Sequence, residues 1–266
     1  MTKKSLRQLL LLDVKSGLKH HATLSAVYCI AYRLLEASER FTTFLNRAKL
    51  GNNEKARQRA CACLAAFAPQ LLSTFRGDGR LLVVPLISSG SRVAAPGEFP
   101  YQLAEALVEA MEALQKGSAA FRPDKLGKRP HRSIHTITEG PEIRHAEVSG
   151  AYHLIGDVPN RCHILLVDDF VTLGSTFSAA AEPFLNVAGG SDMSITALAL
   201  AWCCRPRRGM TISNGHLPPS IWQLAGLSSG WKVKAAAAAR TRMSFVAAET
   251  AESACELAEH ACDVRQ

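Results

Sequence analysis

Two adjacent carboxylates and a run of hydroxyl-bearing residues follow one apolar segment of the sequence. Asp168 and Asp169 come directly after the four aliphatic residues Ile164–Val167. The next turn reads, after two further apolar residues, Thr172, Leu173, Gly174, Ser175 and Thr176. Carboxylates can accept hydrogen bonds from vicinal sugar hydroxyls or approach a metal-bound diphosphate, whereas a turn rich in backbone N–H groups and hydroxyls suits a phosphate. The order of these parts predicts a site for a phosphorylated sugar.

The elements that position these residues can be inferred from the same stretch. A run of aliphatic residues such as Ile164–Val167 is typical of a strand covered on both faces in a parallel sheet. Ligands of such sheets bind beyond the carboxyl ends of the strands. Gly174 permits a backbone conformation that most residues resist, and a helix expected to begin near Thr176 would add its positive end. The alternative interpretation is a buried strand followed by an acidic turn and a helix cap.

The stretch Ile164–Thr176 resembles the phosphoribosyl diphosphate (PRPP) motif of type I phosphoribosyltransferases. The resemblance implies an α/β fold with a Rossmann-like, mostly parallel sheet flanked by helices. It further implies that Asp168 and Asp169 lie at the ribose hydroxyls and approach Mg²⁺, directly or through water. Residues 172–176 would then bind the 5′-phosphate. The first residue of this turn is usually an acid in members that act on 6-oxopurines, and Thr172 therefore argues against hypoxanthine or guanine as the acceptor.

A second strand and loop extend the resemblance. Leu81–Leu86 is another aliphatic strand, and a small polar loop follows it before the helix expected over Pro100–Gln115. In the family, a loop at this place holds the diphosphate through backbone N–H groups. The matching positions are Ser88, Ser89, Gly90 and Ser91, and Arg92 could add charge. Taken alone, the loop is more simply interpreted as an ordinary strand-to-helix turn.

A basic stretch lies between these two parts. Residues 122–132 contain two prolines, a glycine and several basic side chains. In the family, a mobile segment between early sheet elements covers the substrate and often presents basic groups to the diphosphate. The residues that could do so here are Lys125, Lys128, Arg129 and Arg132. A solvated basic loop is an equally good interpretation.

Within the family, the chain is most similar to ComF-like proteins, a phosphoribosyltransferase-like branch linked to DNA uptake. The stretches Glu98–Leu107 and Glu142–Ile155 carry this weaker part of the resemblance. One departure is plain, because ComF-type proteins usually carry paired zinc-binding cysteines near the N-terminus. Cys61 and Cys63 have no second pair, so we do not expect a zinc finger.

The chain has 266 residues, of which 47% are hydrophobic, which excludes a disordered or fibrous protein. We expect three parts: a basic helical extension over residues 1–76, the phosphoribosyltransferase-like domain over 77–206, and a C-terminal hood or helical extension over 207–266. Residues 1–60 hold 12 Lys and Arg against 4 Asp and Glu, whereas the remainder holds 19 of each. The first part predicts three helices before the sheet begins near Leu81: Leu6–Leu18, Thr23–Leu50 and Glu54–Phe75.

The partners expected from these features are PRPP or a nucleotide. The basic N-terminal helices could also meet nucleic acid, although a solvated helical face is the simpler interpretation. An acidic stripe of glutamates in Phe245–Cys262 could face those helices within one chain or across a homodimer. The apolar runs Leu9–Leu12 and Ala22–Leu35 are too short for a signal-peptide core or a membrane span, and the cysteines show no secreted pattern. We therefore expect a cytoplasmic protein with no membrane contact.

Two functions remain open from the sequence. The first is a phosphoribosyltransferase that binds PRPP with Mg²⁺ and transfers the phosphoribosyl group to a nitrogenous base or related acceptor, releasing diphosphate. The second is a non-catalytic regulator that senses PRPP or a nucleotide, or a ComF-like DNA-handling protein. Both readings place a ligand on Asp168–Thr176, so the motif does not separate them.

Overall fold

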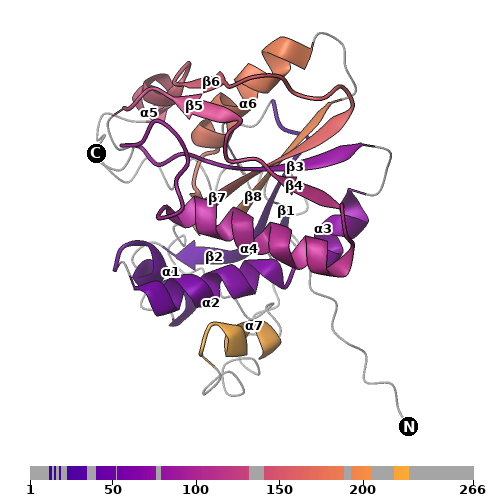
Figure 1. Cartoon of the computed structure of the whole chain (residues 1–266). Helices are drawn as coiled ribbons and strands as arrows, with labels where there is room; N and C mark the ends of the chain where they lie inside the picture. Colours follow the sequence, from indigo (N-terminus) through magenta and orange to yellow (C-terminus); the bar gives the residue numbers. More distant parts are fainter. Residues whose placement is uncertain are drawn as a thin grey trace.

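The structure is a computed structural model, and it describes residues 12–13, 15, 18, 23–34, 40–51, 53–75, 79–131, 141–188, 193–204 and 219–227. In this part of the chain, helices flank a mostly parallel six-stranded sheet (Figure 1). The order of the strands is β1-β2-β8-β7-β3-β4, and only β1 runs antiparallel to its neighbour. The predicted α/β class with a mostly parallel sheet is therefore confirmed.

The strands of the large sheet are β1 (Leu12–Asp13), β2 (Ala26–Leu34), β3 (Arg80–Pro85), β4 (Ala119–Phe121), β7 (Cys162–Val171) and β8 (Ser194–Cys204). A second sheet pairs β5 (Leu126–Lys128) with β6 (Tyr152–Leu154) in antiparallel fashion. The helices are α1 (Arg40–Lys49), α2 (Glu54–Ala65), α3 (Ala68–Thr74), α4 (Phe99–Leu114), α5 (Pro141–Val148), α6 (Ser175–Ala188) and α7 (Pro219–Leu224).

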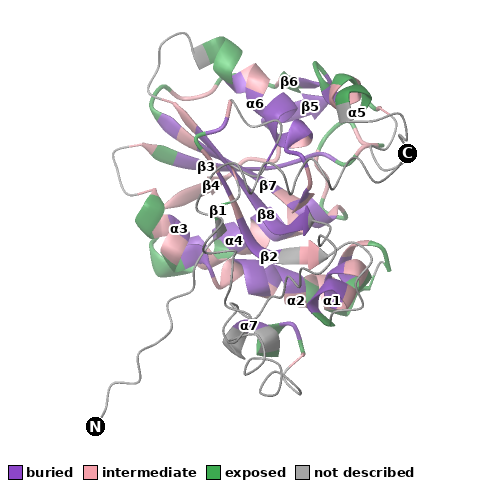
Figure 2. Ribbon diagram, turned by 180° about the vertical axis from the view of Figure 1, so that it is seen from behind, coloured by how far each residue is buried: buried purple, intermediate pink, exposed green. Residues whose placement is uncertain are grey.

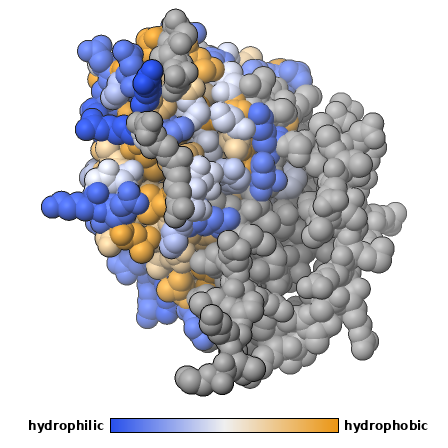
Figure 3. All heavy atoms as spheres, turned by 90° about the vertical axis from the view of Figure 1, so that its right-hand side faces the viewer, coloured by the Kyte–Doolittle hydropathy of each residue, from blue (hydrophilic) through white to orange (hydrophobic). Residues whose placement is uncertain are grey.

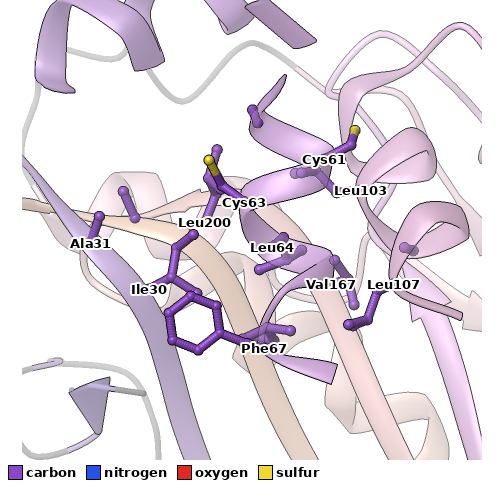
Figure 4. Close-up of a cluster of buried hydrophobic side chains, with 14 of the residues drawn as sticks. Ile30, Ala31, Cys61, Cys63, Leu64, Phe67, Leu103, Leu107, Val167 and Leu200 are labelled. Carbon is purple, nitrogen blue, oxygen red and sulfur yellow. The ribbon is translucent and has the colours of Figure 1, made fainter. Parts of the chain in front are cut away.

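The large sheet is buried on both faces. Alternate residues of β3 and β7, such as Val83 and Leu165, pack with α1 to α4, and their neighbours Leu82 and Ile164 pack with α6. The inner strands β3, β7 and β8 are accordingly among the most continuously buried elements in Figure 2. Figure 4 shows Leu64 and Phe67 reaching the sheet from α2 and the turn after it. Burial on both faces explains why these strands read as unbroken aliphatic runs.

The helix predicted over Thr23–Leu50 is wrong in its first half. Residues 26–34 form β2, which pairs in parallel with β8, and only the second half is helical, as α1. A short apolar run satisfies a helical and a buried-strand pattern equally, and the choice depends on whether a sheet edge is free to pair. Here β8 offers that edge. The sheet therefore does not begin near Leu81, and the basic N-terminal segment supplies one of its inner strands.

The other predicted elements fall into two groups. Leu81–Leu86, Pro100–Gln115, Ile164–Val167 and the helix near Thr176 correspond to β3, α4, β7 and α6. The ends agree within one or two residues, except that β7 continues four residues past Val167 and so includes both carboxylates. Glu54–Phe75 forms two helices, α2 and α3, because Pro69 starts a new helix at its first turn. Leu6–Leu18 and the acidic stripe of Phe245–Cys262 lie largely or wholly outside the described residues.

Large apolar side chains that are exposed belong to several different elements, including Leu50, Leu114 and Val187. On the face seen in Figure 3, hydrophobic and hydrophilic side chains are interspersed. Among the residues that the structure describes, no helix combines the length and the apolar composition needed to cross a bilayer.

Candidate functional site

The connections after β3 and β7 diverge, although these two strands are neighbours. β3 leads through α4 to β4 on its outer side, whereas β7 leads through α6 to β8 on the opposite side. The two helices also cover opposite faces of the sheet. In open α/β sheets, ligands bind in the crevice outside the carboxyl ends of strands at such a divergence. The loops after β3 and β7 are those predicted to hold the diphosphate and the 5′-phosphate.

The two carboxylates lie on the part of β7 that projects beyond β3. Pairing with β3 ends at Pro85 opposite Val167, while β7 stays paired with β8 from Asp168 onward. Asp168 is half-buried and Asp169 is buried. The Nζ atom of Lys49, the last residue of α1, lies 2.7 Å from Oδ1 of Asp169. The acidic pair is therefore at the predicted rim, but one carboxylate already has a cationic partner.

The surroundings of Asp168 shift the pKa of its side chain. Burial raises the pKa of Asp168 to about 7, the negative charge of Asp169 adds to this, and Lys49 and Lys128 oppose it. Burial by itself would lower the pKa of Lys49, but the charges of Asp169 and Asp168 outweigh it, and the pKa of this ammonium is raised. Lys49 is therefore charged near neutral pH and lies against Asp169, and Asp168 is the acid whose pKa is raised toward neutrality.

The predicted phosphate turn has the required backbone. Gly174 has φ +86°, a conformation that favours glycine, as predicted. The N–H group of Ser178 donates to the carbonyl of Gly174 in the first turn of α6, so the N–H groups just before it lack intrahelical acceptors. The indole Nε1–H of Trp202 donates to the carbonyl of Thr172 at 3.3 Å. The turn is thus held by a side chain of β8, and the first N–H groups of α6 follow it directly, as in helix N-termini that bind anions.

Most hydrogen bonds to the carbonyl groups of the 87–92 loop come from one neighbouring segment, residues 128–131. Lys128 Nζ donates to the carbonyls of Ile87 at 2.6 Å and Ser88 at 2.8 Å, the N–H of Lys128 donates to Arg92, and the N–H of His131 donates to Ser89. Glycine is not required in this loop by its backbone conformation, because Gly90 is absent from the positions with positive φ. The contacts that hold this loop in place are therefore made mainly through its carbonyl groups.

The N–H groups of the same loop are largely free. Within the described part of the chain, the N–H groups of Ser89, Gly90 and Arg92 have no acceptor, whereas the N–H of Ser88 contacts Oε2 of Glu98 at 3.4 Å. A Cβ atom added at Gly90 would meet no atom within 4 Å. Successive free N–H groups on an open surface can bind an anion. The loop therefore presents N–H donors of the kind that an anion requires.

The basic stretch 122–132 is not a solvated loop throughout. Lys125 and Lys128 are 6% and 2% exposed. The Nζ of Lys125 donates to the carbonyl of Asp157 at 2.6 Å, away from the 87–92 loop, while Arg129 is exposed. Arg132 lies outside the described residues. The structure therefore brings Lys128 to the predicted site, places Lys125 elsewhere and leaves the side chain of Arg129 in solvent.

The acidic pair fits Mg²⁺ in part. Neighbouring carboxylates at the end of a parallel strand are oxygen ligands of the type that Mg²⁺ takes together with substrate phosphates and water. A bound cation would stabilise the ionised form of Asp168, whose pKa is raised by burial and by the charge of Asp169. Asp169 is already neutralised by Lys49. No cluster of three or more His, Cys, Asp or Glu side chains occurs in the described residues.

Two residues at the site were missed by the sequence analysis. Lys49 belongs to the basic N-terminal segment, which was interpreted as a helical extension, and Trp202 was given no role. Lys49 is 120 positions from Asp169, and Trp202 is 30 positions from Thr172. The sequence signals available for them were a basic residue ending an amphipathic helix and a tryptophan ending a buried strand, which do not name a partner.

The sequence matches no protein-family model, and it shows no significant similarity to any curated protein. The resemblance to phosphoribosyltransferases therefore rests on the motif residues and on the geometry described above.

The strained position in the phosphate turn provides a direct prediction about stability. We expect Gly174→Ala to lower the free energy of unfolding by about 1–2 kcal/mol, because an L-residue resists positive φ. The matched control is Gly90→Ala, where the added methyl group meets open space, and there we expect a change below about 0.5 kcal/mol. Urea unfolding of both variants measures the difference, and equal effects would contradict the assigned turn.

Proposed function

We propose that this protein binds PRPP with Mg²⁺ at the carboxyl ends of β3 and β7 and transfers the phosphoribosyl group to a nitrogenous acceptor, with release of diphosphate. The observation that carries the proposal is the convergence of two anion sites of different kinds at one strand divergence. One is the Gly174 turn with the start of α6, and the other is the 87–92 loop with its free N–H groups. The carboxylates of β7 lie at the same rim.

Two anion-binding segments at one edge of the sheet favour a sugar that carries phosphate at two of its positions. A mononucleotide needs a single phosphate site, and the carboxylates repel a phosphate placed directly on them. PRPP carries a 5′-phosphate at one end of its ribose and a diphosphate at the other, with two hydroxyls between. In the proposed complex, residues 172–176 bind the 5′-phosphate, Asp168 accepts hydrogen bonds from the hydroxyls, and residues 88–92 hold the diphosphate.

The proposed reaction breaks the C1′–O bond to diphosphate and forms a C1′–N bond to the acceptor. Diphosphate leaves with the bonding electron pair, and the acceptor nitrogen gives up a proton after it attacks. The chain would contribute positioning and charge stabilisation, and no covalent intermediate with the protein is needed. Bound Mg²⁺, held on the protein side by Asp168, would supply positive charge for the leaving diphosphate. Lys49 would hold the Asp169 side chain in place through their ion pair.

The first experiment is calorimetry of the full chain with PRPP and Mg²⁺, followed by an assay of diphosphate release with a panel of bases. The variant Gly90→Ala provides a sharp test, because its methyl group meets no protein atom but would lie where the diphosphate is proposed. We expect it to weaken PRPP binding by about tenfold, or 1.4 kcal/mol, at unchanged stability. Gly97→Ala, another open position in the same connection, should have no effect on either property.

The results separate the candidate functions. Binding without turnover of any base would favour a PRPP sensor over an enzyme. Absence of binding by PRPP and by nucleotides would overturn both. Equal PRPP affinities of the Gly90→Ala and Gly97→Ala variants would show that the diphosphate does not bind at the 87–92 loop.

The pKa of Asp168 predicts how binding depends on pH. The proposed complex uses the carboxylate, and burial with the Asp169 charge raises its pKa to about 7, so protonation competes with PRPP and Mg²⁺ below that pH. We expect the affinity to rise with pH from pH 6 through pH 7 by up to about tenfold. Above pH 8 it should fall again, because burial lowers the pKa of Lys128 to about 8 and the loop then loses the charge of this ammonium. Titration calorimetry at several pH values measures this, and a profile that is flat from pH 6 through pH 7 would contradict the assigned role of Asp168.

A further inference from the structure

The second buried lysine of the basic stretch has an unusual set of contacts. The Nζ atom of Lys128 donates to two consecutive carbonyl groups, those of Ile87 and Ser88, and lies 5.3 Å from the centre of the Tyr152 ring. The hydroxyl group of Tyr152 also donates to the carbonyl of Ile87 at 3.5 Å. Because Lys128 is 2% exposed, its ammonium does not reach into solvent in front of the loop.

These contacts place a positive charge behind the loop. An ammonium is a donor only, so it holds the loop by its carbonyl groups. The backbone N–H of Lys128 also binds the carbonyl of Arg92, so one residue holds both ends of the 87–92 loop. The N–H groups of Ser89 and Gly90, for which the described residues offer no acceptor, are then left for a ligand.

From this geometry we infer that Lys128 is a positioning residue that creates the diphosphate subsite from behind, by holding the loop carbonyls and by placing an ammonium group on the side of the loop opposite its free N–H groups. The inference rests on the proposed function and changes the role expected for Lys128, which is not a mobile contact that closes over the substrate. The ligand class is an inorganic or sugar-linked diphosphate. A single phosphate bound at residues 172–176 would not depend on Lys128.

The test compares three ligands: PRPP with Mg²⁺, inorganic diphosphate with Mg²⁺, and ribose 5-phosphate. For Lys128→Met we expect a loss of about 30-fold or more in affinity for the first two ligands, and a change below about twofold for ribose 5-phosphate. Lys128→Arg should keep most of the affinity, since it retains the charge and the donors. Lys128→Gln keeps donors without the charge and should fall between the Met and Arg variants.

Lys125→Met is the matched control, because Lys125 is a buried lysine three residues earlier that binds the carbonyl of Asp157 instead of the loop. We expect this variant to be less stable but to show no selective loss of affinity for diphosphate. Equal losses for all three ligands in Lys128→Met would show a general structural effect and overturn the inference, as would an unchanged affinity for diphosphate. If Lys128→Met does not fold, the affinities of the Lys128→Arg and Lys128→Gln variants for the same three ligands are compared. Equal diphosphate affinities of these two variants would then overturn the inference.

Failure of the inference and failure of the proposed function are distinguishable. If the unmodified protein binds neither PRPP nor inorganic diphosphate, the proposed function and the subsite both fail. If it binds both and Lys128→Met binds them equally well, only the role of Lys128 is wrong.

Discussion

Replacing Asp168 by Asn is expected to abolish PRPP binding and to stabilise the protein at the same time. Charge-assisted hydrogen bonds of a carboxylate contribute about 1.5–3 kcal/mol each, so we expect PRPP affinity to fall by about 100-fold or more. The stability gain follows from burial and from the charge of Asp169, which raise the pKa of Asp168 to about 7. Opposite effects on stability and binding are typical of residues kept for function.

The sign of the stability change depends on pH. A carboxyl group whose pKa is higher in the folded state adds stability below its unfolded pKa, near 3.8, and this stability is lost as pH rises to about 7. Above pH 7 the ionised Asp168 therefore disfavours folding, and Asn removes that cost. We expect a gain of about 1–2 kcal/mol at pH 8, allowing for solvent screening of a half-buried group, and almost none at pH 4.

Urea unfolding at pH 4 and pH 8, with calorimetry of PRPP binding at pH 8, measures both effects. The isosteric change Asp124→Asn is a control, because this exposed carboxylate has its pKa lowered by hydrogen bonds from Arg122, and its replacement should stabilise nothing. A loss of stability in Asp168→Asn at pH 8 would mean that its carboxylate is held by favourable partners.

Replacing Lys49 by Met should destabilise the protein by about 2–3 kcal/mol. The change leaves the carboxylate of Asp169, whose side chain is 7% exposed, without its ion-pair partner at 2.7 Å. Breaking a buried ion pair from one side costs about 3–5 kcal/mol, and the partial exposure of Lys49 reduces this. PRPP binding should weaken as well, because an unpaired Asp169 would add to the negative charge at the ribose.

A double-mutant cycle isolates this pair. Asp169→Asn in the Lys49→Met background should recover part of the lost stability, giving a coupling energy of about 1–3 kcal/mol in urea unfolding. The exposed pair of Arg122 and Asp124, at a similar distance of 2.8 Å, is the matched control, and Arg122→Met should cost less than about 1 kcal/mol. Additive effects at Lys49 and Asp169 would show that the ion pair contributes nothing to the fold.

The local order of the site could be predicted from one short stretch of sequence. Ile164–Val167 had to be a strand buried on both faces, and Gly174 had to provide the turn into a helix, because neighbouring residues impose these choices through sterics and hydrogen bonding. The 87–92 loop could be placed after a strand for the same reason. What the sequence could not show was which groups of this loop are already bound, since the donor to its first carbonyls is Lys128, 41 positions from Ile87.

The sequence by itself therefore determined the strand, turn and helix that carry Asp168 and Gly174, because these features follow from residues close together in the chain. Only the tertiary structure decided that Ala26–Leu34 is a strand, that Lys49 pairs with Asp169, and that Lys128 lies behind the loop. The physical reason is the same in each case. An apolar run or a lysine satisfies several local patterns, and the partner that selects among them lies on a segment distant in sequence, brought close only when the sheet assembles.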